Sequence, residues 1–353
     1  MANFENFEVK GIVTTLSPIS HSTIPPLGSE LEKGRQWTDF RSMPFVLQNE
    51  EGKEVPYSVY TVSGNSIRGI MRTLLYRHTF QDVLDIDFDE LLGADSELKM
   101  STQKRRFLVA TLASGGVTPK GTHLEAAAPA GEYERILRDI PMLDLFGGVY
   151  LAHHFDSCAS IGNMTLRCKE TKALFGDMFH DDNENLPTIR SVNTADIRFT
   201  RTQSNQDASE NPDMDENEEN NKTKAIFGTN VLPAGTTFYW RNYCNTANEG
   251  TKLAFYAAIA LLQKYASVGG MSGKGLGRVS YDLEPDLTDA IKDYDEYILA
   301  HKDECIEAIK SMAKHFLSTV KTKTEAKEEE EAKKAKKGKK TTKKTKEVAK
   351  EDE

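Results

Sequence analysis

A glycine-rich segment in the last third of the chain combines the residue types that bind phosphate. The segment SVGGMSGKGLGRVSYDL covers residues 267–283 and carries five glycines, at positions 269, 270, 273, 275 and 277. Glycine lets a backbone amide approach a phosphate closely because no side chain intervenes. Basic side chains in the same turn would add charge-assisted hydrogen bonds. The segment therefore predicts an anion-binding turn whose ligands are Gly270, Ser272, Lys274 and Arg278.

The known nucleotide-binding motifs do not fit this segment. In a P-loop the glycines end in GK[ST] and open a helix, whereas Lys274 is followed by Gly275 and then by strand-forming residues. The dinucleotide fingerprint has the same strand-then-helix order and fails for the same reason. We therefore expect no cofactor. The alternative to phosphate binding is a flexible connection between a helix and a strand.

A second set of phosphate-binding residue types lies where a helix is expected to begin. In the segment SGNSIRGIMRTLLYRHTF (63–80), apolar residues recur at helical spacing. A helix N-terminus attracts anions through its dipole and its unbonded amides. The alternatives are that Ser63 only caps the helix, and that the arginines lie on a solvated face or in ion pairs. The predicted ligands are Ser63, Asn65, Ser66, Arg68 and Arg72.

One compact group of residues has side chains that zinc accepts, namely His153, His154, Asp156 and Cys158. A two-residue pitch along a strand would put the last three on one face. However, the four cysteines of the chain form no CxxC pair, and no second pair of ligands is evident. We expect ordinary polar strand residues here, no metal, and no disulfide framework.

The elements that position these residues follow from periodicity and composition. A first strand is predicted over 7–16, and a polar, proline-containing stretch follows to about residue 57. A mostly helical insertion, with the basic run Lys104, Arg105 and Arg106, is expected over about 80–141. Further strands are predicted over 164–168, 191–200 and after the glycine-rich segment, and further helices over 252–265 and about 286–317.

A long hairpin is predicted from 193–202 and 225–239, separated by an acidic segment. Residues 203–222 hold seven acidic residues and one lysine, which cannot form a packed core, so we expect a disordered tip. The segment AIFGTNVLPAGTTFYWRNY is interpreted as a strand pair around a turn at Pro233, Ala234 and Gly235. The tail over 321–353, with 13 lysines and 9 acidic residues, is also expected to be disordered.

The net charge of −9 does not exclude nucleic acid as a partner, because binding depends on local basic surface rather than on the total. No apolar run is long enough to cross a bilayer, and the first residues have no basic region or cleavage site typical of a signal peptide. We expect a reduced, cytoplasmic protein that does not engage a membrane.

Three of these segments, in this order, resemble the RAMP superfamily of CRISPR-associated proteins. VSGNSIRGIMRTLL (62–75) resembles the signature in which a small-residue turn starts the first helix. NTADIRFTRTQ (193–203) with AIFGTNVLPAGTTFYW (225–240) resembles the thumb of the family, and the glycine-rich segment ending in GxGRV resembles its C-terminal loop. LDLFGG (143–148) is similar to a shorter family element. Departures from the family are the long insertion, the acidic tip and the lysine-rich tail.

The resemblance implies an α/β fold: a ferredoxin-like (RRM-like) palm with an inserted helical fingers region and a protruding β-hairpin thumb. The palm would cover 1–80 and 142–320, with the thumb at about 192–240 and its tip at 203–222. The fingers would cover 81–141, and the tail 321–353. Arg198 and Arg201 of the thumb then join the predicted RNA-binding residues.

The implied function is that of a backbone subunit of a class 1 effector complex, of type IV or type I rather than type III. Such a subunit binds guide RNA, assembles with copies of itself and with other effector subunits, and presents the guide for pairing with target DNA or RNA. Its contacts to the guide would be cationic and independent of sequence. An apolar thumb strand would displace a base at intervals.

The resemblance also suggests two candidates for chemistry. In metal-independent ribonucleases of the superfamily a histidine near the position of His21 acts as an acid or base. Type III backbone subunits use an aspartate in this loop to cut RNA, and Asp39 is the only aspartate between residues 14 and 60. The loop differs from that pattern, so we expect no catalysis. The alternatives are a RAMP ribonuclease, for target cleavage or guide processing, and a general single-stranded RNA-binding protein.

Overall fold

The computed structural model describes residues 5–22, 35–49, 51–116, 130–150, 153–176, 185–201 and 225–319. The chain forms two compact units: unit 1 combines Met1–Leu75 with Cys158–Tyr294, and unit 2 combines Tyr76–Ser157 with Asp295–Glu353. Among the described residues, no helix is long and apolar enough to cross a membrane. The predicted hairpin tip (203–222) and the lysine-rich tail (321–353) lie outside the described residues.

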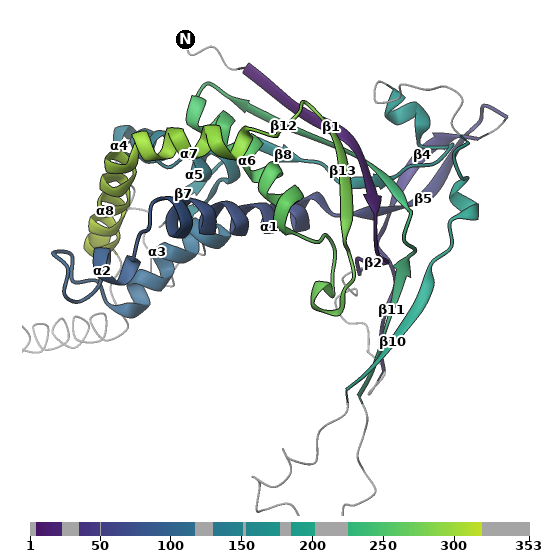
Figure 1. Cartoon of the computed structure of the whole chain (residues 1–353), viewed down its shortest axis with the longest axis horizontal. Helices are drawn as coiled ribbons and strands as arrows, with labels where there is room; N and C mark the ends of the chain where they lie inside the picture. The colour runs from purple at the N-terminus through teal and green to yellow at the C-terminus, as the bar shows by residue number, and fades with distance from the viewer. Residues whose placement is uncertain are drawn as a thin grey trace, which may run out of the picture. The chain divides into compact units, whose positions relative to one another are not determined.

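An antiparallel sheet forms the framework of unit 1 (Figure 1). In the described part of the unit its seven strands follow the order β13–β1–β12–β9–β5–β4, with β8 paired to β12. The strand predicted over 7–16 and the strand predicted after the glycine-rich segment are confirmed as β1 and β13. The strands are β1 (Glu5–Thr15), β4 (Ser42–Gln48), β5 (Glu54–Val62), β8 (Ala159–Ile161), β9 (Met164–Leu166), β12 (Thr237–Thr246) and β13 (Val279–Glu284).

Two helices accompany this sheet. In α1 (Gly64–Arg77) the side chains of Ile67, Met71 and Leu75 are fully buried, which confirms the predicted apolar face. Helix α6 (Glu249–Tyr265) packs against β12. It begins three residues before the predicted start at 252, because the side chain of Asn248 accepts a hydrogen bond from the amide of Gly250 (3.0 Å) and caps the helix there.

The stretch from residue 17 to about 57, predicted only as polar and proline-containing, includes β2 (Ile19–Ser20), β3 (Arg35–Thr38), β4 and the start of β5, which the sequence patterns missed. Strands β4 and β5 each contain a proline, Pro44 and Pro56, and proline counts against a strand. The prolines are tolerated because β4 is the last strand of the sheet and β5 pairs with β9 only at Thr61 and Val62. Neither proline therefore has to donate to a second neighbouring strand.

A smaller sheet carries the predicted hairpin, which Figure 1 shows projecting away from the larger sheet. Strand β10 (Ala195–Arg201) pairs antiparallel with β11 (Ala225–Leu232), with Phe199 opposite Phe227, so the hairpin is confirmed, but its second strand ends at Leu232 and not at the predicted residue 239. Strand β11 also pairs with β2 (Ile19–Ser20) and, in parallel, with β3 (Arg35–Thr38). The base of the hairpin is thus joined to the segment that follows β1.

The prediction of a strand pair around the turn at Pro233, Ala234 and Gly235 is wrong. Strand β11 lies in the smaller sheet, whereas β12 lies in the larger sheet between β1 and β9. The turn is held by Thr15 at the end of β1, whose carbonyl accepts from the amide of Gly235 (2.7 Å) and whose hydroxyl donates to the carbonyl of Pro233 (3.0 Å). The turn therefore transfers the chain from one sheet to the other.

Unit 2 is mostly helical, as predicted for the insertion. Its core includes Leu108 and Leu112 of α3 and Ile309 and Met312 of α8, all fully buried. The single helix predicted over about 286–317 is two helices, α7 and α8, separated at His301. The helices are α2 (Phe88–Leu92), α3 (Thr102–Ser114), α4 (Ala130–Asp139), α5 (Pro141–Phe146), α7 (Ala290–Ala300), which starts in unit 1, and α8 (Lys302–Thr319).

The division between the two units differs from the predicted division at residues 81, 141 and 320. Residues 142–157 and 295–319 group with the helical insertion rather than with the sheet. The reason is that α8 packs on α3 and α4 and supplies part of their apolar core, which no local pattern in the sequence reveals.

Candidate functional site

Segments that are far apart in the sequence meet around the two-residue strand β2 in unit 1. The carbonyl of Ser20 accepts a hydrogen bond from the amide of Gly270 in the glycine-rich segment (2.6 Å). The hydroxyl of Ser20 is hydrogen-bonded to the hydroxyl of Thr229 on β11 (3.0 Å), and both residues are buried. The next residue, His21, uses Nε2 to accept from the amide of Ser63 at the start of α1 (2.9 Å). We call these contacting segments the β2 cluster.

The first amides of α1 are already bonded to side chains from elsewhere in unit 1. The amide of Ser63 donates to His21, and the amide of Gly64 donates to Oδ1 of Asn163 (2.8 Å). The carbonyl of Ser63 accepts from the amide of Ile67 (3.1 Å), so Ser63 occupies the N-cap position, as predicted. Because of these contacts, fewer backbone amides at the start of α1 are available to bind a ligand than the sequence of the helix suggests.

The predicted ligands on α1 differ in exposure. Asn65 and Ser66 are exposed, whereas Ser63 is buried. Arg68 is half-buried, and burial lowers the pKa of its guanidinium. Arg72 is only 7% exposed, which excludes the alternative that it lies on a solvated face. Burial, and next the charge of Arg68, lower the pKa of Arg72 to about 10. An anion bound beside the two arginines would relieve this repulsion.

The glycines of the glycine-rich segment fall into two groups. At Gly269 and Gly277 a Cβ atom would lie 2.3 Å from the carbonyl oxygen of Ser20 and 2.0 Å from that of Val268. Both have a positive φ, +85° and +81°, so glycine is required there by packing and by backbone conformation. A Cβ at Gly273 would meet nothing within 4 Å. The open positions are therefore at the apex of the segment, not at its two ends.

The glycine-rich segment is braced against the chain between β1 and β2. The amide of Gly277 donates to the carbonyl of Pro18 (2.9 Å), and the amide of Arg278 donates to the hydroxyl of Ser17 (2.9 Å). At the apex, Ser272–Lys274 forms a short 3-10 turn, in which the amides of Lys274 and Gly275 donate to the carbonyls of Met271 and Ser272. The alternative of a loosely held connection is therefore not supported. The side chains of Ser272, Lys274 and Arg278, all exposed, are the groups best able to contact a ligand.

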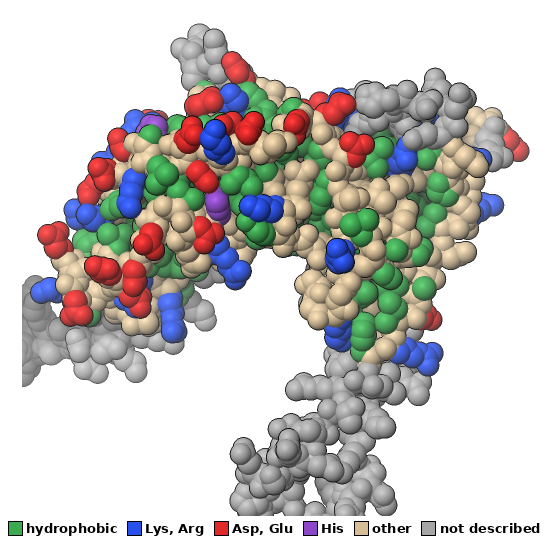
Figure 2. Space-filling model, in the orientation of Figure 1, with side chains coloured by type: hydrophobic (Ala, Val, Ile, Leu, Met, Phe, Trp, Pro, Cys, Tyr) green, Lys and Arg blue, Asp and Glu red, His purple; other side chains and the backbone are tan. Residues whose placement is uncertain are grey.

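The hairpin contributes an aromatic ring to the glycine-rich segment. The Nζ atom of Lys274 lies 3.7 Å from the centroid of the Phe199 ring on β10. Side chains alternate along a strand, so the exposed Arg198 lies on the opposite face of β10 from Phe199. The side chain of Arg201 lies outside the described residues. In Figure 2, hydrophobic and basic side chains occur together over the β10–β11 hairpin.

The two candidates for catalysis, His21 and Asp39, hold structural contacts. Burial, and next the charge of Arg41, lower the pKa of His21, which keeps its ring neutral and able to accept from the amide of Ser63. Asp39 is exposed, and its Oδ1 accepts from Nδ2 of Asn230 on β11 (3.0 Å). Each residue thereby links the chain after β2 to another part of unit 1.

The remaining candidates from the sequence lie apart from the β2 cluster. In unit 2, Lys104 is buried, Arg105 pairs with Asp89 (2.7 Å), and Arg106 is exposed. His153 and His154 lie on strand β7 (His153–Phe155), which ends before Asp156, so the two-residue pitch does not continue to Cys158. Within the described ranges, no group of three His, Cys, Asp or Glu residues could hold a metal ion.

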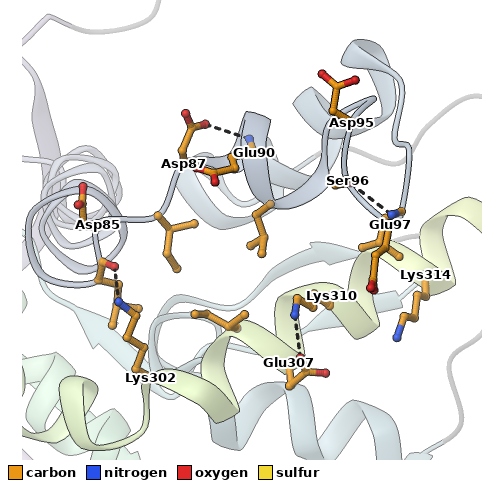
Figure 3. A pocket seen from close by; sticks show the side chains of 15 residues that line it. Asp85, Asp87, Glu90, Asp95, Ser96, Glu97, Lys302, Glu307, Lys310 and Lys314 are labelled. Atoms are coloured by element: carbon orange, nitrogen blue, oxygen red, sulfur yellow. Dashed lines mark hydrogen bonds and ion pairs between the residues drawn. The ribbon is translucent and has the colours of Figure 1, made fainter.

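Unit 2 also contains a hollow of about 630 Å³ that no sequence motif indicated. Acidic residues of the 84–98 segment, among them Asp85 and Asp95, line one side of the hollow and lysines of α8 line the other (Figure 3). Two of these lysines have partners: Lys302 donates to the carbonyl of Leu84 (3.0 Å), and Lys310 pairs with Glu307 (3.0 Å). One wall of the hollow therefore carries acidic side chains, and the wall formed by α8 carries lysines and Glu307.

Sequence reasoning missed two residues that organise the site. Asn163 had no signal, because its role depends on the approach of β9 to the start of α1. Phe199 had a weak signal, an aromatic residue between polar residues in an alternating strand, which did not indicate its contact with Lys274.

No protein-family model and no curated protein sequence matches the chain. Among solved structures, a chain of the structure named "Type IV-B CRISPR Complex" is similar, with a TM-score of 0.49 and 15% sequence identity. The alignment covers 79% of this chain and 91% of that chain.

Proposed function

We propose that this chain is an RNA-binding backbone subunit of a class 1 CRISPR effector complex and a member of the RAMP superfamily. In this proposal it binds the guide RNA along unit 1 and assembles with further copies of itself and with other effector subunits. The guide, and not the protein, then reads the target by base pairing.

The observation that carries the proposal is the meeting of three segments around β2. They are the start of α1, the β10–β11 hairpin and the glycine-rich segment, and they are the three that resemble the RAMP superfamily. Hydrogen bonds that involve Ser20 and His21 join all three. In this proposal the segments form one RNA-binding surface that includes Arg68, which is half-buried, and Lys274 and Arg278, which are exposed.

The topology of unit 1 supports a ferredoxin-like palm in this proposal. Elements β1, α1, β9, β12, α6 and β13 occur in the order strand, helix, strand, strand, helix, strand. The four strands lie side by side in the order β13–β1–β12–β9. This is the split βαβ arrangement of ferredoxin-like domains. The β10–β11 hairpin, inserted between β9 and β12, would then be the thumb.

The chemistry of the cluster favours RNA binding over catalysis. His21 Nε2 is already an acceptor for the amide of Ser63, so it is not available to accept a proton from a 2′-hydroxyl group. The carboxylate of Asp39 is hydrogen-bonded to Asn230. We therefore expect complementary RNA to remain intact in the presence of the protein.

The test is the affinity for a labelled single-stranded guide RNA, measured at several salt concentrations. The triple variant Arg68→Ala, Lys274→Ala and Arg278→Ala should bind more weakly, whatever the RNA sequence. For single-stranded RNA each phosphate contact contributes about −0.7 to the slope of log K against log salt, so the slope of the triple variant should be less steep by about 2.

A control variant removes three lysines of unit 1 that lie outside the β2 cluster, Lys53, Lys172 and Lys264, each replaced by Ala. It changes the net charge by the same amount as the triple variant and should keep the affinity and the salt slope. Equal losses in the two variants would show that the effect is one of net charge and would overturn the proposed site. Absence of RNA binding by the unmodified chain, purified with its neighbouring gene products, would overturn the function.

A further inference from the structure

The contact between Lys274 and Phe199 joins two segments of the β2 cluster through side chains. Lys274 is exposed at the apex of the glycine-rich segment, and Phe199 is half-buried on β10. The distance of 3.7 Å from Nζ to the ring centroid is well within the range of a cation–π interaction. Such a contact fixes a side chain that would otherwise sample many rotamers.

We propose that Phe199 is a positioning residue for Lys274, holding its ammonium group where a phosphodiester of single-stranded RNA passes between the glycine-rich segment and the β10–β11 hairpin. The inference rests on the proposed function, because it assigns a role within the same RNA-binding surface. It adds Phe199 to the proposed RNA-binding surface and gives a chemical reason for an aromatic residue at this position, neither of which the sequence motifs supply.

Lysine needs such a partner more than arginine does. Its ammonium group is a point charge on a flexible four-carbon stem, and ordering that stem costs rotamer entropy. A group ordered before the ligand arrives does not incur this cost on binding. An ammonium group over one ring face interacts with the ring on one side only, so it can still donate to a phosphate oxygen from the other.

Both partners of the contact are anchored to β2. The glycine-rich segment is fixed by the hydrogen bond from the amide of Gly270 to the carbonyl of Ser20, and the hairpin by the pairing of Val231 with Ser20. The hydroxyl contact between Ser20 and Thr229 adds a third link. Because the two backbones are held by the same strand, the position of Lys274 relative to Phe199 is defined by the fold of unit 1.

Unit 1 also contains a matched pair outside the cluster. The Nζ atom of Lys264 lies 4.8 Å from the centroid of the Tyr265 ring at the end of α6. These two residues are neighbours in the sequence, so their contact links no separate segments. Replacing Tyr265 therefore removes an aromatic partner of a lysine without altering the β2 cluster.

The experiment compares RNA affinity and salt slope among Phe199→Leu, Phe199→Tyr, Lys274→Gln and the double variant Phe199→Leu with Lys274→Gln. Phe199→Leu removes the ring and should weaken binding about two- to fivefold, the range expected for an exposed cation–π contact. Phe199→Tyr keeps the ring and should bind as the unmodified chain does. In the double variant the loss should equal that of Lys274→Gln alone, because the ring then has no ammonium group to position.

Pentafluorophenylalanine at position 199 provides a second variant if Phe199→Leu does not fold. It keeps the shape of the ring and removes the negative potential of its face, so it should weaken binding as Phe199→Leu does. Tyr265→Leu should leave the affinity unchanged. Thermal unfolding of each variant distinguishes loss of the contact from loss of the fold.

The outcomes separate this inference from the proposed function. If the unmodified chain binds RNA while Phe199→Leu binds equally well, Phe199 does not position Lys274, although the RNA-binding function stands. Additive losses in the double variant would likewise overturn the inference, because they would show that the two residues act independently. If the unmodified chain does not bind RNA, the proposed function itself fails.

Discussion

A series of alanine substitutions in the glycine-rich segment should separate glycines required by the fold from glycines left open at the surface. Gly277 has a φ of +81°, and a Cβ there would lie 2.0 Å from the carbonyl oxygen of Val268. Gly275 has a φ of +80° but open space around the Cβ position. Gly273 has neither constraint. The three positions therefore differ in one structural feature at a time.

The expected losses of stability follow from these features. A side chain in the left-handed region costs about 1 to 2 kcal/mol, which is the whole effect expected for Gly275→Ala. Gly277→Ala adds the displacement of a backbone that makes two hydrogen bonds, with Val268 and Pro18, each 2.9 Å long and each contributing about 1 kcal/mol. The free energy of unfolding of unit 1 should then fall by about 3 kcal/mol. Gly273→Ala should change it by less than about 0.5 kcal/mol.

Thermal unfolding followed by calorimetry provides the assay. In a domain of about 200 residues, 1 kcal/mol corresponds to about 2 to 4 °C in Tm. Gly277→Ala should therefore lower the Tm of the transition of unit 1 by about 6 to 12 °C, while Gly273→Ala should leave it nearly unchanged. Equal Tm values for these two variants would refute the assignment of Gly277 to the fold, and a large loss in Gly273→Ala would refute the open apex.

Substitutions at two further positions, His21 and Asn163, test the links around the start of α1. Because burial and Arg41 lower the pKa of His21 below its usual 6.5, the unfolded chain binds the proton more tightly, so the stability that His21 contributes should be fully present above pH 6.5 and decline as the pH falls below it. The variant His21→Gln should lose this part of the pH dependence of Tm between pH 5 and 7.5. An unchanged pH profile of Tm would contradict the role of the neutral ring as an acceptor. Asn163→Ala removes the acceptor for the amide of Gly64 and should lower the free energy of unfolding, measured in urea, by about 1 kcal/mol. Asn163→Asp keeps an acceptor at the helix N-terminus and should lower it by less. Equal losses in the two variants would argue against helix capping by Asn163.

Local patterns in the sequence were sufficient for several elements of this protein. Apolar spacing predicted α1, and alternation predicted β1 and the strands of the hairpin. These elements are encoded locally because the periodicity of a helix or a strand relates residues that are only a few positions apart in the sequence. The same locality explains the missed strands β4 and β5, whose prolines are tolerated only because of where the strands lie in the sheet.

The tertiary structure decided what the motif residues do. The sequence grouped five glycines as one anion-binding turn, but contacts to Ser20 and Val268 make Gly269 and Gly277 part of the packing. Arg72 was predicted to contact a ligand, and it is buried. Spacing within a motif specifies which residues are close along the chain, but not which of them another segment covers.

What brings the candidate site together is a set of contacts between residues that are 42 to 261 positions apart in the chain. The hydroxyls of Ser20 and Thr229 are separated by 209 residues, and the amide of Arg278 reaches Ser17 across 261 residues. The sequence by itself determined the residue types that are proposed to bind RNA and the elements that carry them. The convergence of these elements on β2, and the contact of Lys274 with Phe199, depend on which strands pair within the two sheets and on where the chain crosses from one sheet to the other. No local periodicity in the sequence encodes these features.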